Sequence, residues 1–338
     1  QLSSPEASTA CSIGLLPAPL LPCEDTALTE PCARFTLTSL EIHMKSRPPL
    51  LSDPENEHDA IELVVYATDD VRAGDEHESR TRTFGILAVI SGIVPAAKAF
   101  IASAGLPSNT VVDIVSNEKE LLRRLGYRLS FMDPDVLCGY EIQRSSLGLL
   151  LARAEHLGIP LRQSISRMIY ETPSQRAEHD EGYTADHESG IFVTGRLVLN
   201  IWRRMRAELK LNNYSIGNVS WHLLKTTIPQ FSPAQLQRWY DDPKQRFRTI
   251  RHIFRLADLD SRMLEEMDLV RRTCESARLY GIDFFSVLTR GSQYRVEAAL
   301  IARAHARGFL LLSPQSVTVT RQASLEHIAL VLEPKSSF

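Results

Sequence analysis

The sequence predicts an α/β fold in which layers of helices cover a sheet. Three observations support this prediction. Two early segments, Ala33–Met44 and Ile61–Ala67, alternate apolar and polar residues as half-buried strands do. The stretch Asp133–Ala154 then runs from an apolar strand through a glycine turn into a leucine-rich helix. Beyond residue 199 the pattern is mostly helical. Strands followed by alternating strands and helices are typical of layered α/β domains.

Composition sets broad limits on the function. The chain has 338 residues, of which 43% are hydrophobic and 23% are charged, as in an ordinary globular chain. A net charge of -3 gives no general attraction for nucleic acid, so any such contact needs a local basic patch. The five cysteines contain no Cys-x-x-Cys pair, which disfavours a zinc or iron–sulfur site. No run reaches the roughly 18 apolar residues of a membrane span, so we expect no membrane contact.

The first part of the chain is expected to be a leader followed by strands. Residues 1–33 are rich in Ser, Pro, Ala and Thr, and they predict a disordered leader or linker. The strands Ala33–Met44 and Ile61–Ala67 follow, separated by an acidic loop that contains proline. A further strand is expected in the apolar run at residues 84–94.

The middle of the chain should alternate strands and helices. Thr110–Val115 is expected to be a strand, and the next helix should begin at Ser116 or Asn117 as its N-cap. The strand within Asp133–Ala154 leads into a helix for which Ser146 is the expected N-cap. A polar, acidic insertion at residues 171–190 then predicts a surface loop.

The last part of the chain should be helical, with two strands at its end. Gly281 is placed as a helix terminator, and residues 309–317 and 327–334 are expected to be strands. The segment around Phe284 is expected to be turn-like. The expected helices are Leu199–Leu211, Asn218–Lys225, Ser232–Tyr240, Lys244–Tyr280 and Tyr294–Gly308.

Several stretches resemble family B DNA polymerases. DPDVLCGYEIQRSSL resembles the second exonuclease motif of that family, with Ser146 where the motif has a metal-binding Asp. TSLEIHM resembles the first motif, with Ser39 and Glu41 at its Asp and Glu positions. GRLVLNIWRRM resembles a strand-to-helix joint with Asn200 at an Asp position. LTRGSQYRVE and LEPKSSF resemble segments that lead toward the palm domain. The residues of these motifs are most similar to those of the translesion branch, whose members lack the exonuclease carboxylates.

The resemblance implies an RNase H-like 3'-5' exonuclease fold, a mixed sheet flanked by helices. It would occupy residues 34–290 in degenerate form, and residues 291–338 would connect it to the palm. The whole polymerase would add nucleotides past damaged bases on a DNA primer-template, using Mg²⁺ held by palm aspartates. Its accessory subunits would bind mostly outside this span, and it would be located in the nucleus. We expect this chain to be a fragment that ends before the palm motif, with no cofactor of its own and no polymerase activity alone.

The expected exonuclease acids are largely missing. Ser39 and Ser146 replace two of them, and a hydroxyl is a poor substitute for a carboxylate on a hard divalent ion. Counting back from LTRGSQ puts Leu256 or Ala257 at the Asp position of the third motif, and a shifted register puts Asp258 there. Glu41 is then the only acid left, at most a weak metal ligand, and we predict no proofreading.

Two other hypotheses remain open. One is a residual metal-dependent exonuclease built on Glu41, Asp258 and Glu141. The other is a protein-docking module that uses the insertion at residues 171–190 and the leader. Arg290, Gln293 and Arg295 could contact DNA or could pack between domains, and the sequence favours neither role. Further arginines on expected helices could bind phosphates: Arg203, Arg204, Arg206, Arg246, Arg248, Arg251 and Arg255.

Overall fold

The structure is a computed structural model that describes residues 34–45, 53–72, 82–90, 96–168 and 189–309. Its contacts divide the chain into two units. One comprises Pro22–Gly291, and the other comprises Gln1–Leu21 with Ser292–Phe338. Within the described residues of the second unit, the helix α12 spans Ser292–Ala306. The predicted domain limits of 34–290 and 291–338 stay a prediction.

A six-stranded mixed sheet forms the centre of the larger unit, with the strand order β4-β3-β2-β1-β5-β6. β2 is antiparallel to both β1 and β3, whereas the pairs β3–β4, β1–β5 and β5–β6 are parallel. The mixed sheet confirms the predicted α/β class. The strands are β1 (Arg34–Met44), β2 (Ile61–Arg72), β3 (Thr83–Val89), β4 (Thr110–Val115), β5 (Val136–Gly139) and β6 (Leu197–Asn200).

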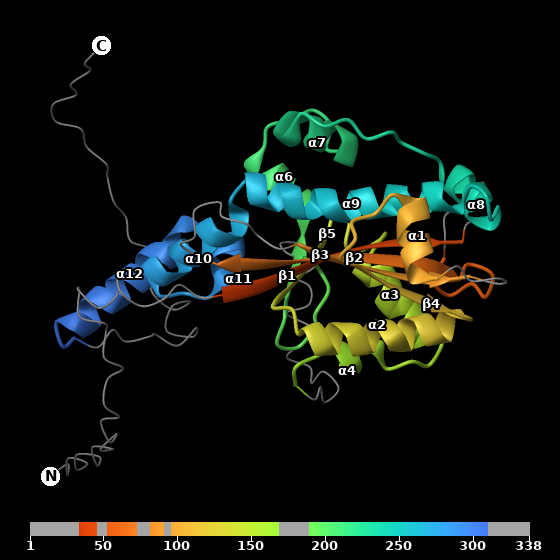
Figure 1. The fold of residues 1–338 in the computed structure, drawn as a ribbon. Helices are drawn as coiled ribbons and strands as arrows, with labels where there is room; N and C mark the ends of the chain where they lie inside the picture. Colours follow the sequence, from red (N-terminus) through yellow and green to blue (C-terminus); the bar gives the residue numbers. More distant parts are fainter. Residues whose placement is uncertain (1–33, 46–52, 73–81, 91–95, 169–188, 310–338) are drawn as a thin grey trace, which may run out of the picture. The chain divides into compact units, whose positions relative to one another are not determined.

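Helices cover both faces of this sheet (Figure 1). On one face lie α2 (Glu118–Met132), α3 (Leu147–His156) and α4 (Leu161–Ile165), whose leucines pack on Leu40, Val64 and Tyr66 of the strands. The long helix α9 (Arg246–Glu266) lies on the opposite face, where Ile250 and Ile253 pack on Leu63 and Val65. Because successive residues of a strand point to opposite faces, β2 contributes to both cores.

The other helices complete the cover of the sheet. α6, α7 and α10 contribute to a further apolar cluster around Leu37, Val136 and Leu199. α1 and α4 are absent from the sequence-based prediction, and α11 replaces the turn that was expected around Phe284. The remaining helices are α1 (Ala97–Ala104), α6 (Ile201–Glu208), α7 (Ile216–Leu224), α8 (Pro233–Asp241), α10 (Leu269–Tyr280) and α11 (Phe284–Thr289).

Local signals predicted several helix ends correctly. The side chain of Asn117 caps α2 by accepting a hydrogen bond from the backbone N of Glu120 at 2.9 Å. Gly281 ends α10 with a φ of 66°. The prediction of one helix over Lys244–Tyr280 is wrong, because Asp268 has a φ of 48° and separates α9 from α10. Asp tolerates this left-handed conformation better than most residues.

Several predictions lie outside the described residues. They concern the leader at residues 1–33, most of the insertion at residues 171–190, and nearly all of the two strands expected after residue 308. No helix in the described residues is long and apolar enough to cross a membrane.

Candidate functional site

The candidate site is centred on β1, where Ser39 and Glu41 occupy alternate positions of the strand and both are buried. Ser39 lies next to Cys138 of β5 in the parallel register. Its Oγ donates a hydrogen bond to the backbone O of Ala257 in α9 at 2.7 Å. A serine therefore joins β1 to α9 at the position where the exonuclease motif has a metal-binding Asp.

Ser146 precedes α3 but does not cap it. Its fully buried Oγ donates to the backbone O of Leu40, and no hydrogen bond joins it to the free N–H groups of the helix. Ser146 thus occupies the predicted N-cap position, but its hydroxyl fastens the start of α3 to β1 and makes no capping hydrogen bond. Little space remains around it, since a Cβ added at Gly139 would lie 2.9 Å from the Ser146 Oγ.

Asn200 has a role in the backbone as well. It ends β6 and serves as the N-cap of α6, where its Oδ1 accepts a hydrogen bond from the backbone N of Arg203 at 3.2 Å. Capping of this kind stabilises a helix by about 1 kcal/mol. The residue at this acidic position of the family thus stabilises a strand-to-helix joint.

The acid that faces Glu41 is Asp260 of α9. Asp260 has 0% exposure, and its carboxyl group and that of Glu41 lie close enough to shift each other's pKa, although neither Asp260 oxygen has a hydrogen-bond partner among the described residues. Ala257, one of the residues predicted for the third motif, is buried and its backbone O accepts the hydrogen bond from Ser39, whereas Asp258 does not join Glu41. The register of the third motif stays a prediction. A signal was present in the sequence, because Asp260 falls in the apolar stripe of α9 that Ile253, Ala257 and Leu264 define.

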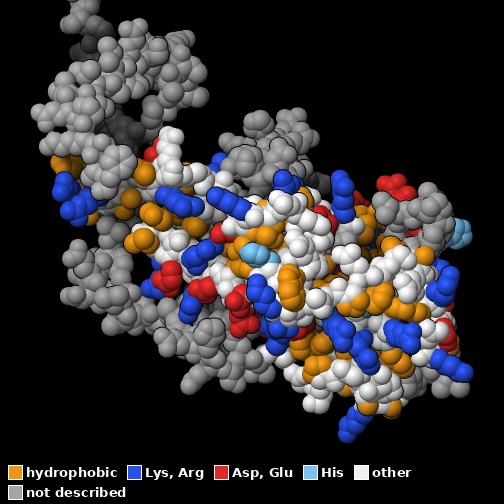
Figure 2. Space-filling model, turned by 90° about the horizontal axis from the view of Figure 1, so that it is seen from above, with side chains coloured by type: hydrophobic (Ala, Val, Ile, Leu, Met, Phe, Trp, Pro, Cys, Tyr) orange, Lys and Arg blue, Asp and Glu red, His pale blue; other side chains and the backbone are white. Residues whose placement is uncertain are grey.

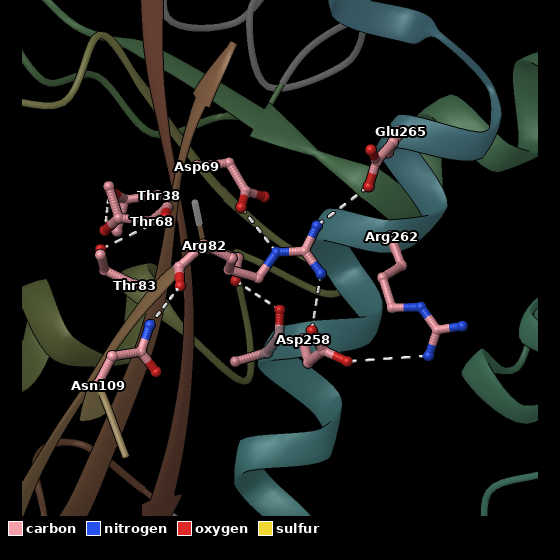
Figure 3. A network of polar contacts seen from close by, with 11 residues as sticks. Thr38, Thr68, Asp69, Arg82, Thr83, Asn109, Asp258, Arg262 and Glu265 are labelled. Carbon is pink, nitrogen blue, oxygen red and sulfur yellow. Dashed lines mark hydrogen bonds and ion pairs between the residues drawn. The ribbon is translucent and has the colours of Figure 1, made fainter. Parts of the chain in front are cut away.

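Asp258 belongs to a separate ionic network (Figure 3). Its Oδ1 accepts a hydrogen bond from Nη1 of Arg82 at 2.7 Å, and its Oδ2 lies 3.9 Å from Nη1 of Arg262. Arg82 also binds Asp69 through Nε at 2.7 Å and Glu265 through Nη2 at 3.2 Å. Asp258 therefore links the start of β3 to α9, and it does not join Glu41.

Glu141, the third acid of the residual-nuclease hypothesis, is half-buried directly after Tyr140. None of the described hydrogen bonds joins its carboxylate to Glu41 or Asp260. The structure thus brings together Glu41 and Asp260, a pair that differs from the set of Glu41, Asp258 and Glu141.

Burial controls the protonation of this carboxyl pair. It raises the pKa of Glu41 to about 7, while the Asp260 side chain and the backbone N–H of Tyr140 favour the charged form of Glu41. That N–H lies 3.3 Å from Oε1 of Glu41. Burial and the nearby Glu41 charge raise the pKa of Asp260 well above its usual range. Two buried acids close together cannot both ionise cheaply, so burial and mutual repulsion favour the neutral form of at least one of them.

This donor set does not fit a pair of divalent ions. Two-metal hydrolysis requires several carboxylates around two ions roughly 4 Å apart. Here the two hydroxyls donate to backbone carbonyls, and burial raises the pKa of both acids, which disfavours the charged forms that a divalent ion needs. Burial also raises the pKa of the neighbouring Cys138 thiol. Among the described residues, no group of three or more His, Cys, Asp or Glu side chains is arranged to hold a metal ion.

The pair should make stability depend on pH. A folded-state pKa of about 7 for Glu41, raised from 4.5, means that its contribution is fully present below pH 4.5 and is lost as the pH rises through 7. We expect the double variant Glu41→Gln/Asp260→Asn to lose this dependence. The unfolding free energy of the wild type minus that of the variant should fall by up to about 1.4 kcal/mol for each unit of pH increase across this window. Urea unfolding between pH 4.5 and 8 checks it, and parallel curves would contradict a raised pKa.

The three predicted DNA-contact residues are divided between the two units. Arg290 is exposed after α11 in the larger unit, whereas Gln293 and Arg295 lie on α12 in the other unit. Nε2 of Gln293 donates to Oε1 of Glu297 at 3.0 Å. Their proposed contact with DNA stays a prediction.

Arginines near α9 contribute to packing and are spread over a mixed surface. Nε of Arg246 donates to the backbone O of Tyr240 at 2.9 Å, and Nε of Arg251 donates to the backbone O of Ala104 at 2.8 Å. The Arg248 guanidinium lies 5.5 Å from the centre of a Trp239 ring. Figure 2 shows Lys and Arg side chains on this face, separated by hydrophobic and uncharged atoms. They form no continuous basic stripe there.

A sequence model described as DNA polymerase family B, exonuclease domain, matches residues 17–219 of the chain. The chain belongs to the family B DNA polymerases. This agrees with the mixed sheet and with the placement of Ser39, Glu41 and Ser146 on the elements that carry the first two exonuclease motifs. Asp260 lies beyond the matched residues, so its position comes from the structure alone.

Within family B, the chain is zeta-like. It is 32% identical to the DNA polymerase zeta catalytic subunit of Arabidopsis thaliana over 100% of the chain and 18% of that protein. It is 34% identical to the mouse zeta catalytic subunit over 90% of the chain and 10% of that protein. A DNA polymerase delta catalytic subunit from Bos taurus is 27% identical over 59% of the chain. The chain thus spans less than a fifth of the length of these two zeta subunits.

Proposed function

We propose that this chain is a structural part of a zeta-like translesion polymerase, with an exonuclease fold that has lost its nuclease chemistry. The observation that supports this most directly is the Glu41–Asp260 pair, whose carboxyl groups are both buried and both have a raised pKa. Ser39 and Ser146 strengthen the proposal, because each uses its hydroxyl to bind two elements of the fold together. The former catalytic position would therefore stabilise the domain.

The proposal extends to the whole polymerase through its relatives. Their names identify them as polymerase catalytic subunits, and we propose that the parent of this chain adds nucleotides to a DNA primer-template with Mg²⁺ bound in the palm domain. Accessory subunits would bind mostly outside this span, and the complex would act in the nucleus. The exonuclease-like domain would support the palm and the DNA from one side.

A nuclease assay tests the loss of chemistry. We expect the 338-residue chain to leave 5'-labelled single-stranded DNA intact in Mg²⁺ or Mn²⁺, because its acids cannot bind two ions. The double variant Glu41→Gln/Asp260→Asn is the matched control and should give the same background rate. Shortening by the wild type that disappears in the control would show that the pair is a working nuclease site.

Neither rival hypothesis gains support from a specific contact. The residual nuclease needs Asp258 close to Glu41, whereas Asp258 is bound by Arg82. The docking hypothesis rests on the insertion at residues 171–190 and on the leader, which lie mostly or wholly outside the described residues. It stays a prediction, and deletion of the insertion with partner binding as the readout would test it.

A further inference from the structure

The outer side of α2 carries a row of four exposed residues spaced four apart, Lys119, Arg123, Tyr127 and Phe131. Residues at this spacing are neighbours on one face of a helix. The opposite side of α2 is filled by buried leucines that pack on the sheet. The row is therefore not needed for the hydrophobic core.

Two aromatic rings stand exposed at one end of this row. Tyr127 is 65% exposed and Phe131 is 76% exposed. Their ring centroids lie 6.4 Å apart with an interplanar angle of 19°, so the rings are stacked nearly parallel. Large aromatic side chains at this exposure leave apolar surface in contact with water, which burial against a ligand would remove. The rings present open π faces to solvent.

Two cations that no described acid neutralises lie at the other end. Neither Lys119 nor Arg123 forms an ion pair with the described residues, although both are on a helix whose other arginines do. Nε of Arg128 is bound to Oδ2 of Asp113 at 2.7 Å, and Nη2 of Arg124 lies 4.0 Å from Oε1 of Glu120. The two acids of α2, Glu118 and Glu120, are paired with Arg153 and Arg124, so the row carries a net positive charge.

We propose that this row on α2 binds single-stranded nucleic acid, with bases stacking on Tyr127 and Phe131 and phosphates meeting Lys119 and Arg123. Exposed aromatics beside cations are the combination that binds single strands with little sequence preference. The row extends over thirteen residues of helix, about 18 Å, which is long enough to contact several nucleotides. A protein partner would need about 800 Å² of surface with an apolar centre, whereas this row offers two apolar side chains beside two charges.

The row is separate from the carboxyl pair. α2 packs on the face of the sheet opposite α9, which carries Asp260. The proposal therefore goes beyond the role of the degenerate site, and substitutions in the row leave Glu41 and Asp260 untouched. The two ideas can fail independently.

Binding of a fluorescein-labelled dT12 strand to the 338-residue chain tests the row by anisotropy. Tyr127→Ala/Phe131→Ala should weaken binding at least about tenfold, because each stacked base contributes about 1–3 kcal/mol. Trp221→Ala, which removes an exposed aromatic from α7, is the matched control and should bind as wild type does. Lys119→Gln/Arg123→Gln should reduce the slope of log K against log salt by about 1.4, since each phosphate contact on a single strand contributes about 0.7.

Photocrosslinking locates the contact directly. A dT12 strand containing 5-iodouracil should attach to the peptide that contains Tyr127, and mass spectrometry identifies it. Crosslinks confined to other peptides, or unchanged dT12 affinity in the aromatic variant, would overturn the proposal. Binding to vesicles of anionic lipid that the aromatic substitutions abolish, with dT12 affinity unchanged, would assign the row to a membrane surface and would equally overturn it. All variants should keep the wild-type melting temperature, because the four side chains are exposed.

Discussion

Ser39→Asp is expected to lower the free energy of unfolding by about 3–5 kcal/mol at pH 8. The substitution restores an acid of the family motif, yet the position is fully buried on the same face of β1 as Glu41, whose pKa is already raised by burial. A third carboxyl group there has no cationic partner among the described residues. It would also face the backbone O of Ala257, which now accepts a hydrogen bond from Ser39. Chemical denaturation of the variant and the wild type measures the difference.

Ser39→Ala is the control for this experiment. It removes one buried hydrogen bond without adding charge, so the expected loss is about 1 kcal/mol. The cost of Ser39→Asp should also grow between pH 5 and 8, because the added acid must ionise at higher pH. A loss below about 1 kcal/mol at pH 8, no larger than that of the alanine variant, would mean that the site still accommodates the full acidic set.

The second large effect is expected at Arg153, which is 2% exposed on α3. Its Nε and Nη2 each bind a carboxylate oxygen of Glu118 at 2.9 Å, and its Nη1 donates to the backbone O of Pro54 at 3.1 Å and of Asn56 at 2.7 Å. Arg153→Met would leave the Glu118 charge and both carbonyl groups without this donor. We expect a loss of about 3–5 kcal/mol in unfolding free energy, measured by urea denaturation.

Two further variants separate the ion pair from simple loss of packing. Arg124→Met replaces an exposed arginine on α2 and should change stability by less than about 0.5 kcal/mol. Glu118→Gln combined with Arg153→Met should recover part of the loss, because it removes the unpaired charge. Equal stability of Arg153→Met and Arg124→Met would show that the buried pair does not stabilise the fold.

Much of the fold followed from local patterns in the sequence. Alternation in Ala33–Met44 predicted β1 because one face of that strand packs against a core, and the N-cap Asn117 predicted the start of α2. The helices α1 and α4 were missed. They are short, 8 and 5 residues, and neither carries a side-chain cap. Elements of that length depend on tertiary packing more than on their own sequence.

The candidate site was predicted only in part. Ser39, Glu41 and Ser146 were placed through the resemblance of TSLEIHM and DPDVLCGYEIQRSSL to two exonuclease motifs. Asp260 was missed because the motif count from LTRGSQ considered only residues 256–258 and took no account of which α9 side chains face β1. An acid within the buried stripe of a helix needs a compensating partner, and that partner, Glu41, lies 219 residues earlier in the chain.

Manganese binding tests the central claim most directly, because Mn²⁺ occupies the same oxygen sites as Mg²⁺ and can be counted by electron paramagnetic resonance. We predict that the chain and its variant Glu41→Gln/Asp260→Asn bind Mn²⁺ equally weakly at pH 7.5, with no site that depends on this pair. Two tightly bound ions in the wild type that the double variant loses would contradict the account, since they would require Glu41 and Asp260 to be ionised together.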